Sequence, residues 1–380
     1  MEETKTEKSS SQERAIIFDT SVRKLKHIQI CLEYDVQAKN RTTGLEDINF
    51  IHNATTDLDL STIDLSTKVF DKKLKIPLIC SGMTGGHEFA LDFNHILSQA
   101  VNITGIGMGC GSQRAALEDK ELEKTFSIIR KNAPESLIIG NIGAGQIAEN
   151  LSMSDFIDIK NMVDANAVAI HFNPLQEAIQ PEGDTKLKGL HKKIKRLVSD
   201  TKIPIIAKEV GCGFSLYDYK KLDEMGFSGV DVQGLGGTSW SGVESIRASS
   251  ISTLHSKTGE IFWDFGNPTA VSTVIGVNNF SGSVIGSGGV RNGLDAAKLI
   301  ALGAKAAGMA IPFLFSVKGR SVQEVVNLIK EFEYQLRLAC FLTGCENISD
   351  LVHVPLMITG KTAEQFRNIG IDPSIYATRE

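Results

Sequence analysis

Four polar side chains fall within one short segment of the sequence, HFNPLQE at residues 171–177. His171, Asn173 and Gln176 can hydrogen-bond a substrate or assist a proton transfer. Glu177 is a carboxylate of the kind that holds Mg²⁺ together with phosphate oxygens and water. A lone histidine or glutamate is more often a packed or solvated residue, but four polar side chains that converge on one turn favour a functional site.

The basic run RKLKH, which contains Arg23, Lys24 and His27, is a second candidate. A run of charges is usually a solvated face. Here the run lies near the N-terminus of a chain whose formal net charge is −5. We expect it to fold over the site and to clamp an anion such as a diphosphate.

The elements that must position these residues alternate regularly along the chain. Short apolar runs, each followed by a glycine or polar turn and a helical stretch, lie at 76–80, 104–108, 137–141, 167–171, 203–209, 228–233, 281–287 and 304–310. Eight strands that alternate with helices predict a parallel sheet that closes into a (β/α)₈ TIM barrel. We expect the barrel over residues 76–315, an N-terminal extension over 1–75 and a helical C-terminal extension, packed on the barrel, over 316–380. The long stretch between Gln233 and Ser281 predicts an extended loop and helix after the sixth strand.

A doubly wound open sheet is the alternative fold. Gly143, Gly145 and Ala148 fit the GxGxxG/A spacing of a dinucleotide-binding turn, and Asp164 lies near the required distance. This match follows the third predicted strand, whereas the fingerprint belongs to the first βα turn. We therefore favour the barrel.

Active sites of (β/α)₈ barrels are built from the C-terminal ends of the strands. At the first six ends we expect polar or adaptable residues, namely Ser81, Met83, Thr84, Ser112, Gln113, Arg114, Asn141, His171, Lys208 and Thr238. The last two strands end in small residues, GSGGVRNG and GMA, whose backbone N–H groups can approach a phosphate. Because strands seven and eight carry the usual phosphate site of such barrels, we expect phosphate binding at Gly286, Gly288, Arg291, Met309 and Ala310.

Lys208 ends the apolar run IPIIAKE. A purely structural lysine there would need a buried carboxylate partner, and we expect Glu209 to point to the other face. A cation beside a planar cofactor that accepts negative charge is the interpretation we favour.

Composition excludes several classes of protein. The small negative net charge and the lack of a basic stripe argue against a nucleic-acid binder. Six cysteines without a CxxC pair indicate reduced thiols. The start has no signal-peptide pattern, and no apolar run reaches the length of a membrane span. We expect a cytoplasmic protein with no nucleic-acid or membrane partner.

The chain resembles the type 2 isopentenyl-diphosphate isomerases, which are flavin-dependent (β/α)₈ enzymes, over roughly residues 14–375. The specific motifs are RKxxH near the N-terminus and HxNxxQE after the fourth strand. SGMTGG, KEVGCG, DVQGLGGTSW and GSGGVRNG also match, although the glycine pair and the strand-five lysine are generic to flavin barrels.

The resemblance implies interconversion of isopentenyl and dimethylallyl diphosphate with FMN, reduced by NADPH or NADH, and without net redox change. It implies that Mg²⁺ is held by Glu177 and that the chain forms a tetramer or octamer. FMN would be held by Met83, Thr84, Ser112, Asn141, Lys208, Ser239 or Thr238, the Gly286–Arg291 turn and Met309–Ala310, with Ser81 beside them. The substrate would be held by Arg23, Lys24, His27, Arg114, His171, Asn173 and Gln176.

Moving a double bond by one carbon requires a proton to be added at one carbon and removed at another. No pair of carboxylates is evident for this work, whereas a reduced flavin can supply the proton. Gln176 is best placed to assist, either in acid–base chemistry or by orienting the substrate.

Two other functions remain open from the sequence. An FMN-dependent 2-hydroxyacid oxidase or dehydrogenase would use His171 or His255 as base and Arg291 for the substrate carboxylate, and would leave RKxxH and HxNxxQE unexplained. A barrel that binds a phosphate sugar or nucleotide without catalysis predicts that no flavin is bound.

Overall fold

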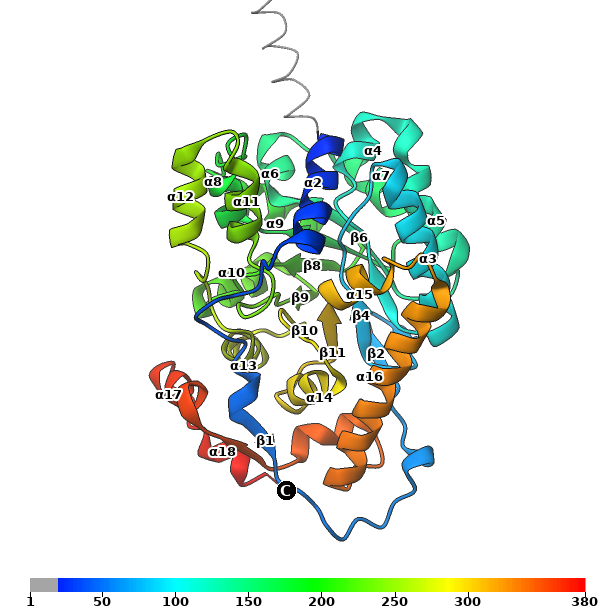
Figure 1. Cartoon of the computed structure of the whole chain (residues 1–380), viewed down its shortest axis with the longest axis vertical. Coiled ribbons are helices and arrows are strands. Elements are labelled where there is room, and N and C mark those ends of the chain that lie inside the picture. Colours follow the sequence, from blue (N-terminus) through cyan, green and yellow to red (C-terminus); the bar gives the residue numbers. More distant parts are fainter. Residues whose placement is uncertain (1–19, 380) are drawn as a thin grey trace, which may run out of the picture.

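Eight parallel strands form a closed barrel in a computed structural model that describes residues 20–379 (Figure 1). They are β4 (Leu78–Cys80), β5 (Gly107–Gly109), β6 (Ile138–Gly143), β7 (Ala167–His171), β8 (Ile205–Lys208), β9 (Gly229–Asp231), β10 (Ser283–Ser287) and β11 (Ala306–Met309). Each strand pairs with the next in the chain, and β11 pairs with β4 to close the ring. The predicted TIM barrel is confirmed, and the doubly wound sheet is excluded.

Apolar side chains cover both faces of the strands, which is why the runs are almost continuously hydrophobic. Residues such as Ile79, Ile139 and Ile206 fill the inside of the barrel. Their neighbours, such as Leu78 and Ile138, belong to the larger core beneath the helices. Because alternating residues of each strand are buried on both faces, the polar site residues lie at the C-terminal strand ends.

The helices of the barrel wall surround the strands. They are α3 (Glu88–Thr104), α4 (Arg114–Glu118), α5 (Lys124–Asn132), α6 (Ala144–Glu149), α7 (Met153–Met162), α8 (Pro174–Ile179), α9 (Leu190–Asp200), α10 (Leu216–Met225), α11 (Trp240–Ala248), α12 (Thr253–Ile261), α13 (Thr269–Asn279), α14 (Gly293–Ala301) and α15 (Ile311–Ser316). No helix in the described part of the chain is long and apolar enough to cross a bilayer.

Three helices, α11, α12 and α13, replace the extended loop and single helix expected between β9 and β10. Ser239 and Ser252 each cap a helix, because their side chains accept hydrogen bonds from the first turns of α11 and α12. Gly259 lets α12 approach α11 closely, since a Cβ there would lie 2.7 Å from the Ser245 Cβ. These capping serines are the signal in the sequence that predicts the extra helices.

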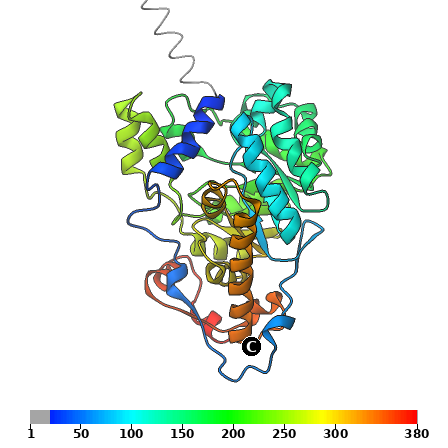
Figure 2. The same ribbon diagram turned by 45° about the vertical axis from the view of Figure 1, so that its right-hand side comes forward.

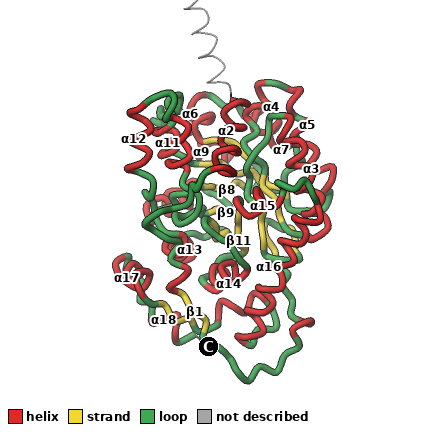
Figure 3. The backbone as a smooth tube through the Cα atoms, viewed as in Figure 1, coloured by secondary structure: helices red, strands yellow, loops and turns green. Residues whose placement is uncertain are grey.

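The two extensions meet at one end of the barrel. β1 (Ile48–Phe50) pairs antiparallel with β12 (Leu356–Ile358), so the C-terminal extension is not purely helical (Figure 3). α16 (Val322–Thr343) runs along the outside of the barrel, and α17 (Gly360–Asn368) and α18 (Ser374–Ala377) follow β12 (Figure 2). The hairpin of β2 (Thr67–Val69) and β3 (Lys72–Leu74) adds Val69 and Leu74 to the apolar cluster inside the barrel.

α2 (Thr20–Glu33) lies near the C-terminal ends of the strands, beside α11 and α15 (Figure 1). Its Lys24 Nζ donates to the Gly85 and Ser112 carbonyl oxygens, 2.8 and 3.0 Å away. The chain then continues as residues 35–43, which we call the strap. The strap runs over the loop after β9, where Gln37 forms a β-bridge with Thr238.

Candidate active site

A large cavity opens beneath α2 at the C-terminal ends of the strands. Of the residues selected from the sequence, the cavity is lined by Arg23, Lys24, His27, Ser81, Met83, Thr84, Ser112, Arg114, Asn141, His171, Asn173, Gln176, Glu177, Lys208, Thr238, Gly288, Arg291, Met309 and Ala310. Residues from the N-terminal extension and from all eight strand ends therefore meet in one place.

Gly286 and Ser239 lie away from this cavity. Gly286 is within β10, and a Cβ there would lie 2.9 Å from the Leu299 Cβ, so the residue faces α14. Ser239 is engaged in capping α11 and donates to the Trp263 carbonyl oxygen. Neither residue lines the cavity, so neither is among the residues proposed below to hold a cofactor.

The glycine turn after β10 forms one wall of the cavity. Gly288 and Gly289 have φ angles of +103° and +71°, which favour glycine. A Cβ at Gly288 would lie 2.2 Å from the Gly234 carbonyl oxygen. Next to this turn, the Arg291 guanidinium donates to the Gln37 side-chain oxygen of the strap. The strap therefore fixes the cation that stands beside the glycine turn.

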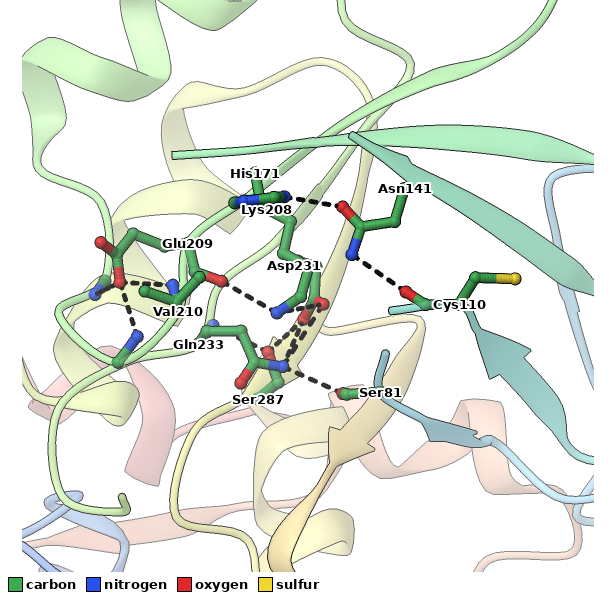
Figure 4. A network of polar contacts seen from close by, with 12 residues as sticks. Ser81, Cys110, Asn141, His171, Lys208, Glu209, Val210, Asp231, Gln233 and Ser287 are labelled. Carbon is green, nitrogen blue, oxygen red and sulfur yellow. Dashed lines mark hydrogen bonds and ion pairs between the residues drawn. The ribbon is translucent and has the colours of Figure 1, made fainter. Parts of the chain in front are cut away.

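The floor of the cavity carries a buried ion pair (Figure 4). The Lys208 Nζ donates to the Glu209 carbonyl oxygen at 2.9 Å and lies 3.5 Å from an Asp231 carboxylate oxygen. Lys208 and Asp231 are paired in register between β8 and β9. Along the sequence, only the neighbouring Glu209 suggests itself as a carboxylate partner of Lys208, and Asp231 carries no local signal.

Glu209 points away from Lys208, as expected. One of its carboxylate oxygens accepts hydrogen bonds from the backbone N–H groups of Val210 and Gly211, each 2.7 Å away. Burial raises the pKa of Glu209 to about 7, against the opposing effect of these hydrogen bonds. Its carboxylate shapes the loop after β8, and the attraction of the Lys208 charge also acts to lower its pKa.

Gln233 is a further cavity residue that the sequence did not indicate. Its φ angle of +41° is unusual for a residue other than glycine. Its Nε2 donates to the Ser81 Oγ and to Asp231, each 3.0 Å away. With both amide hydrogens directed at these partners, Gln233 links the ends of the first and sixth strands.

His171 is neutral and lies in hydrogen-bond contact with Asn141. Burial, together with the charges of Lys208 and Lys24, lowers the pKa of His171 to about 3. The Asn141 Nδ2 donates to the Cys110 carbonyl oxygen, which leaves the Asn141 Oδ1 to accept from the His171 Nδ1 at 2.9 Å. A proton on Nδ1 would satisfy the Asn141 Oδ1, and the Ile142 backbone is a further hydrogen-bond partner of the ring.

The turn after β7 is held by hydrogen bonds among its own side chains. The Asn173 Nδ2 donates to the Gln176 Oε1 at 3.1 Å and to the Glu177 Oε1 at 2.9 Å. The other Glu177 carboxylate oxygen accepts from the Asp184 backbone N–H at 2.7 Å. The convergence predicted from HFNPLQE is therefore present in the structure.

Glu244 of α11 is a buried carboxylate that likewise has no signal in the sequence. It lies 2.8 Å from the His27 Nε2 and accepts from the Gln176 Nε2 at 3.0 Å. Burial opposes its ionisation, but the charges and hydrogen bonds of His27 and Arg247 lower the pKa of Glu244 to about 2. Arg247 also donates to Glu182, 2.8 Å away. We call Glu244, Arg247 and Glu182 the ion-pair cluster. Through His27 and Arg23 this cluster connects α2 to the wall of the cavity.

Cations gather where α2 meets the rim of the barrel. Desolvation and the neighbouring Arg23 lower the pKa of Lys24 to about 7, against the attraction of Glu118. Arg114 forms an ion pair with Glu118 at 2.7 Å. An Arg23 guanidinium nitrogen lies 3.6 Å from a carboxylate oxygen of Glu182 in the ion-pair cluster. Three partly compensated cations thus face the cavity from two elements.

His255, the alternative base for a hydroxyacid oxidase, lies outside the cavity. It is on α12, and its Nδ1 pairs with the Ser252 Oγ at 2.7 Å. His171 is the histidine that lines the cavity together with Arg291.

Comparisons with known proteins identify the relatives of this chain. Residues 151–356 match the family described as FMN-dependent dehydrogenase. Isopentenyl-diphosphate delta-isomerase of Methanococcoides burtonii is 43% identical over 356 residues, which cover 93% of this chain and 97% of that protein. Isopentenyl-diphosphate delta-isomerase of Methanocaldococcus jannaschii is also 43% identical, over 91% of this chain and 96% of its own length.

Solved structures with the same fold include flavoproteins. A double mutant of flavocytochrome b2 with sulfite bound has a TM-score of 0.64 and 18% identity, and the match covers 86% of this chain and 81% of that chain. A mandelate oxidase mutant with a monooxide FMN adduct has a TM-score of 0.58 and 13% identity, with coverage of 90% and 93%. At these identities the likeness supports the fold alone.

Proposed function

Because the chain belongs to the family of isopentenyl-diphosphate delta-isomerases, we propose that it interconverts isopentenyl and dimethylallyl diphosphate in isoprenoid biosynthesis. FMN is the cofactor of the matching dehydrogenase family. The observation that carries the proposal is that three features line one cavity. They are the floor residues Asn141 and Lys208, the cations Arg23, Lys24 and Arg114 at the rim, and the HFNPLQE turn.

The residues of the cavity fit FMN. Gly288 and Gly289 offer a backbone surface without side chains, and Arg291 beside them is a cation suited to the phosphate. Asn141, Lys208 and Gln233 bring polar groups to the floor, where a planar ring can lie against them. Reduced FMN bound here would supply the proton donor and acceptor for the isomerisation. We propose NADPH or NADH as the reductant.

Lys24, Arg23 and Arg114 bind the diphosphate in this proposal. Each is a partly desolvated cation at the rim, and charge-assisted hydrogen bonds to phosphate are among the strong ones. His27 lies between Glu244 and the Trp240 ring, 5.2 Å from the ring centroid. It therefore acts by connecting α2 to α11 and so positions Lys24 and Arg23.

Glu177 holds Mg²⁺ in this proposal. No three His, Cys, Asp or Glu side chains converge as metal ligands among residues 20–379. A cation held by Glu177 would thus depend on the substrate phosphate oxygens and on water, which is how Mg²⁺ is often bound. The Asn173 amide and the Asp184 N–H hold the carboxylate in one orientation beside the cavity.

Gln176 orients the reacting part of the substrate. Its side-chain oxygen accepts from Asn173, and its Nε2 donates to Glu244, so both ends of the amide are fixed. A neutral amide is a poor base, and we assign Gln176 a positioning role. His171 is neutral, so it contributes a hydrogen-bonding ring to the cavity and no positive charge.

Apolar residues close the cavity around the prenyl group. Ile28 and Cys31 of α2, with Trp240, Ile311 and Leu314 on the opposite sides, contribute to the lining. A hydrocarbon chain fits such a wall, and α2 above it keeps water from the carbon that gains or loses a proton.

An anaerobic assay with FMN, Mg²⁺ and a reductant tests the proposal. We expect isopentenyl diphosphate to be converted into dimethylallyl diphosphate. Oxidation of lactate or mandelate in a parallel reaction, without isomerisation, would instead support a 2-hydroxyacid oxidoreductase. A preparation that binds no flavin would support a non-catalytic phosphate-binding barrel.

We further propose that the chain is a cytoplasmic homo-oligomer, a tetramer or octamer. Large apolar side chains are exposed on and after α12, where Leu254 is 73% and Ile261 81% exposed. The cytoplasmic location is supported by the six cysteines, which are all free thiols, as in proteins of reducing compartments. Light scattering of the purified protein tests the oligomeric state.

A further inference from the structure

Asp231 is a buried carboxylate for which the proposed reaction has no direct use. It lies at the end of β9, and only 9% of its surface is exposed. The small space beneath it is lined mainly by apolar residues of the barrel, including Ile79, Ile206 and Ile285. A carboxylate in such a place is costly unless charged or polar partners compensate it. Its presence therefore needs an explanation beyond packing.

The partners of Asp231 come from the two neighbouring strands and from Gln233, which follows β9 (Figure 4). Lys208 of β8 lies 3.5 Å away, the Ser287 Oγ at the end of β10 donates to one carboxylate oxygen, and the Gln233 Nε2 donates from 3.0 Å. Ser287 in turn accepts from the Gln233 backbone N–H at 2.8 Å. The carboxylate is thus immobilised before any ligand binds.

Lys208 has a second anchor that does not depend on Asp231. Its Nζ donates to the Glu209 carbonyl oxygen, 2.9 Å away. The ammonium group therefore stays in place at the cavity floor when Asp231 is neutral, and the main effect of Asp231 is on charge. His171, the next titratable group along the floor, is neutral and does not replace that charge.

We propose that Asp231 is a positioning residue that offsets part of the Lys208 charge and so sets the reduction potential of the FMN bound above it. The inference rests on the proposed FMN site. A cation near the ring favours the anionic reduced flavin, and a carboxylate 3.5 Å from that cation weakens the effect. Ser287 and Gln233 hold the carboxylate at the distance that determines the balance.

The test is the midpoint potential of bound FMN, measured by anaerobic spectroelectrochemical titration. Asp231→Asn should shift the potential to a more positive value, because the Lys208 charge is then uncompensated. Asp158→Asn changes an exposed aspartate of α7 and serves as the matched control with the wild-type potential. Asp231→Glu keeps the charge and should bring the potential back toward that of the wild type.

The Lys208→Met background separates an effect through Lys208 from a direct one. Without the lysine, there is no nearby cation for Asp231 to offset. Adding Asp231→Asn should then leave the potential unchanged. An equal positive shift in both backgrounds would overturn the proposal, as would a wild-type potential in Asp231→Asn itself.

Stability provides a second measurement that remains informative if Asp231→Asn alone does not fold. Lys208→Met leaves a buried carboxylate without its partner, so the double variant should melt at a higher temperature than Lys208→Met. A double variant that melts at the same temperature or lower would contradict the pairing. Failure of the wild-type protein to bind FMN would overturn the proposed function instead, which keeps the two failures distinct.

Discussion

The pH dependence of substrate capture should report on Lys24. The Lys24 Nζ is held against the Gly85 and Ser112 carbonyl oxygens. Desolvation and the neighbouring Arg23 bring its pKa to about 7, so the free enzyme loses this ammonium above neutral pH. A diphosphate binds the protonated form, and kcat/KM follows the ionisation of the free enzyme. We therefore expect kcat/KM to fall as pH rises through 7.

The size of the effect follows from that pKa. With a pKa of about 7, the ammonium form is roughly one part in eleven at pH 8 and about one part in a hundred at pH 9. The plot of log kcat/KM should therefore approach a slope of about −1 above pH 7. Lys24→Met removes a charged hydrogen bond worth about 1.5–3 kcal/mol, which corresponds to a loss of about 10- to 150-fold at pH 6.

The assay is initial-rate isomerisation between pH 6 and 9 at constant ionic strength, with saturating FMN and Mg²⁺. Lys24→Arg keeps its charge throughout this range, so the decline above pH 7 should disappear, at a lower overall rate. Lys26→Arg changes a neighbouring lysine that does not line the cavity, and its profile should match that of the wild type. A wild-type profile that is flat above pH 7, or the same decline in Lys24→Arg, would refute the assignment.

Three further predictions concern the metal, the cofactor and the stability of the fold. Glu177→Gln removes the ionic ligand and should raise the Mg²⁺ concentration for half-maximal activity by about tenfold or more. The Kd for FMN should stay unchanged. An unaltered Mg²⁺ dependence in a metal titration would exclude Glu177 as the ligand. Gly288→Ala should raise the Kd for FMN by at least about tenfold, because its Cβ would lie 2.2 Å from the Gly234 oxygen; fluorescence titration measures this, and wild-type affinity would contradict it. Glu244→Gln should lower the free energy of unfolding by about 1–3 kcal/mol, since Arg247 keeps only Glu182 as an anionic partner; urea denaturation at pH 7 tests this, and unchanged stability would be the contrary result.

The barrel and most of its cavity could be predicted because their signals are local. Each strand is a short apolar run buried on both faces, and barrel geometry brings all the C-terminal strand ends together. Lys208 and Asn141 were found in this way, from their positions directly at strand ends. Gly286 lies within β10 and faces α14, whereas Gly288 lies beyond the strand end, in the glycine turn, and lines the cavity.

The buried acids could not be predicted from their own neighbourhoods. Asp231 becomes the partner of Lys208 only through the register of β8 and β9, and the sequence does not fix that register. Glu244 lies within a short helical pattern, and its partners His27 and Gln176 come from distant segments. Residues of this kind carry a signal only after the fold is assembled.

Pairing between the two ends of the chain was also beyond the sequence. β1 and β12 are three-residue strands that are far apart in the chain, and so short a strand has no distinctive periodicity. The strap likewise has no motif, although Gln37 holds Arg291 beside the glycine turn.

The most direct test of the account is the number of isomerisation turnovers supported by a single reduction of the bound flavin. The enzyme with FMN and Mg²⁺ is reduced once with a stoichiometric amount of dithionite, under strictly anaerobic conditions, and then receives excess isopentenyl diphosphate. We predict many molecules of dimethylallyl diphosphate per FMN, while the flavin spectrum stays that of the reduced form. Product limited to one molecule or fewer per reduced flavin, with reoxidation of the flavin, would contradict an isomerase that works without net redox change.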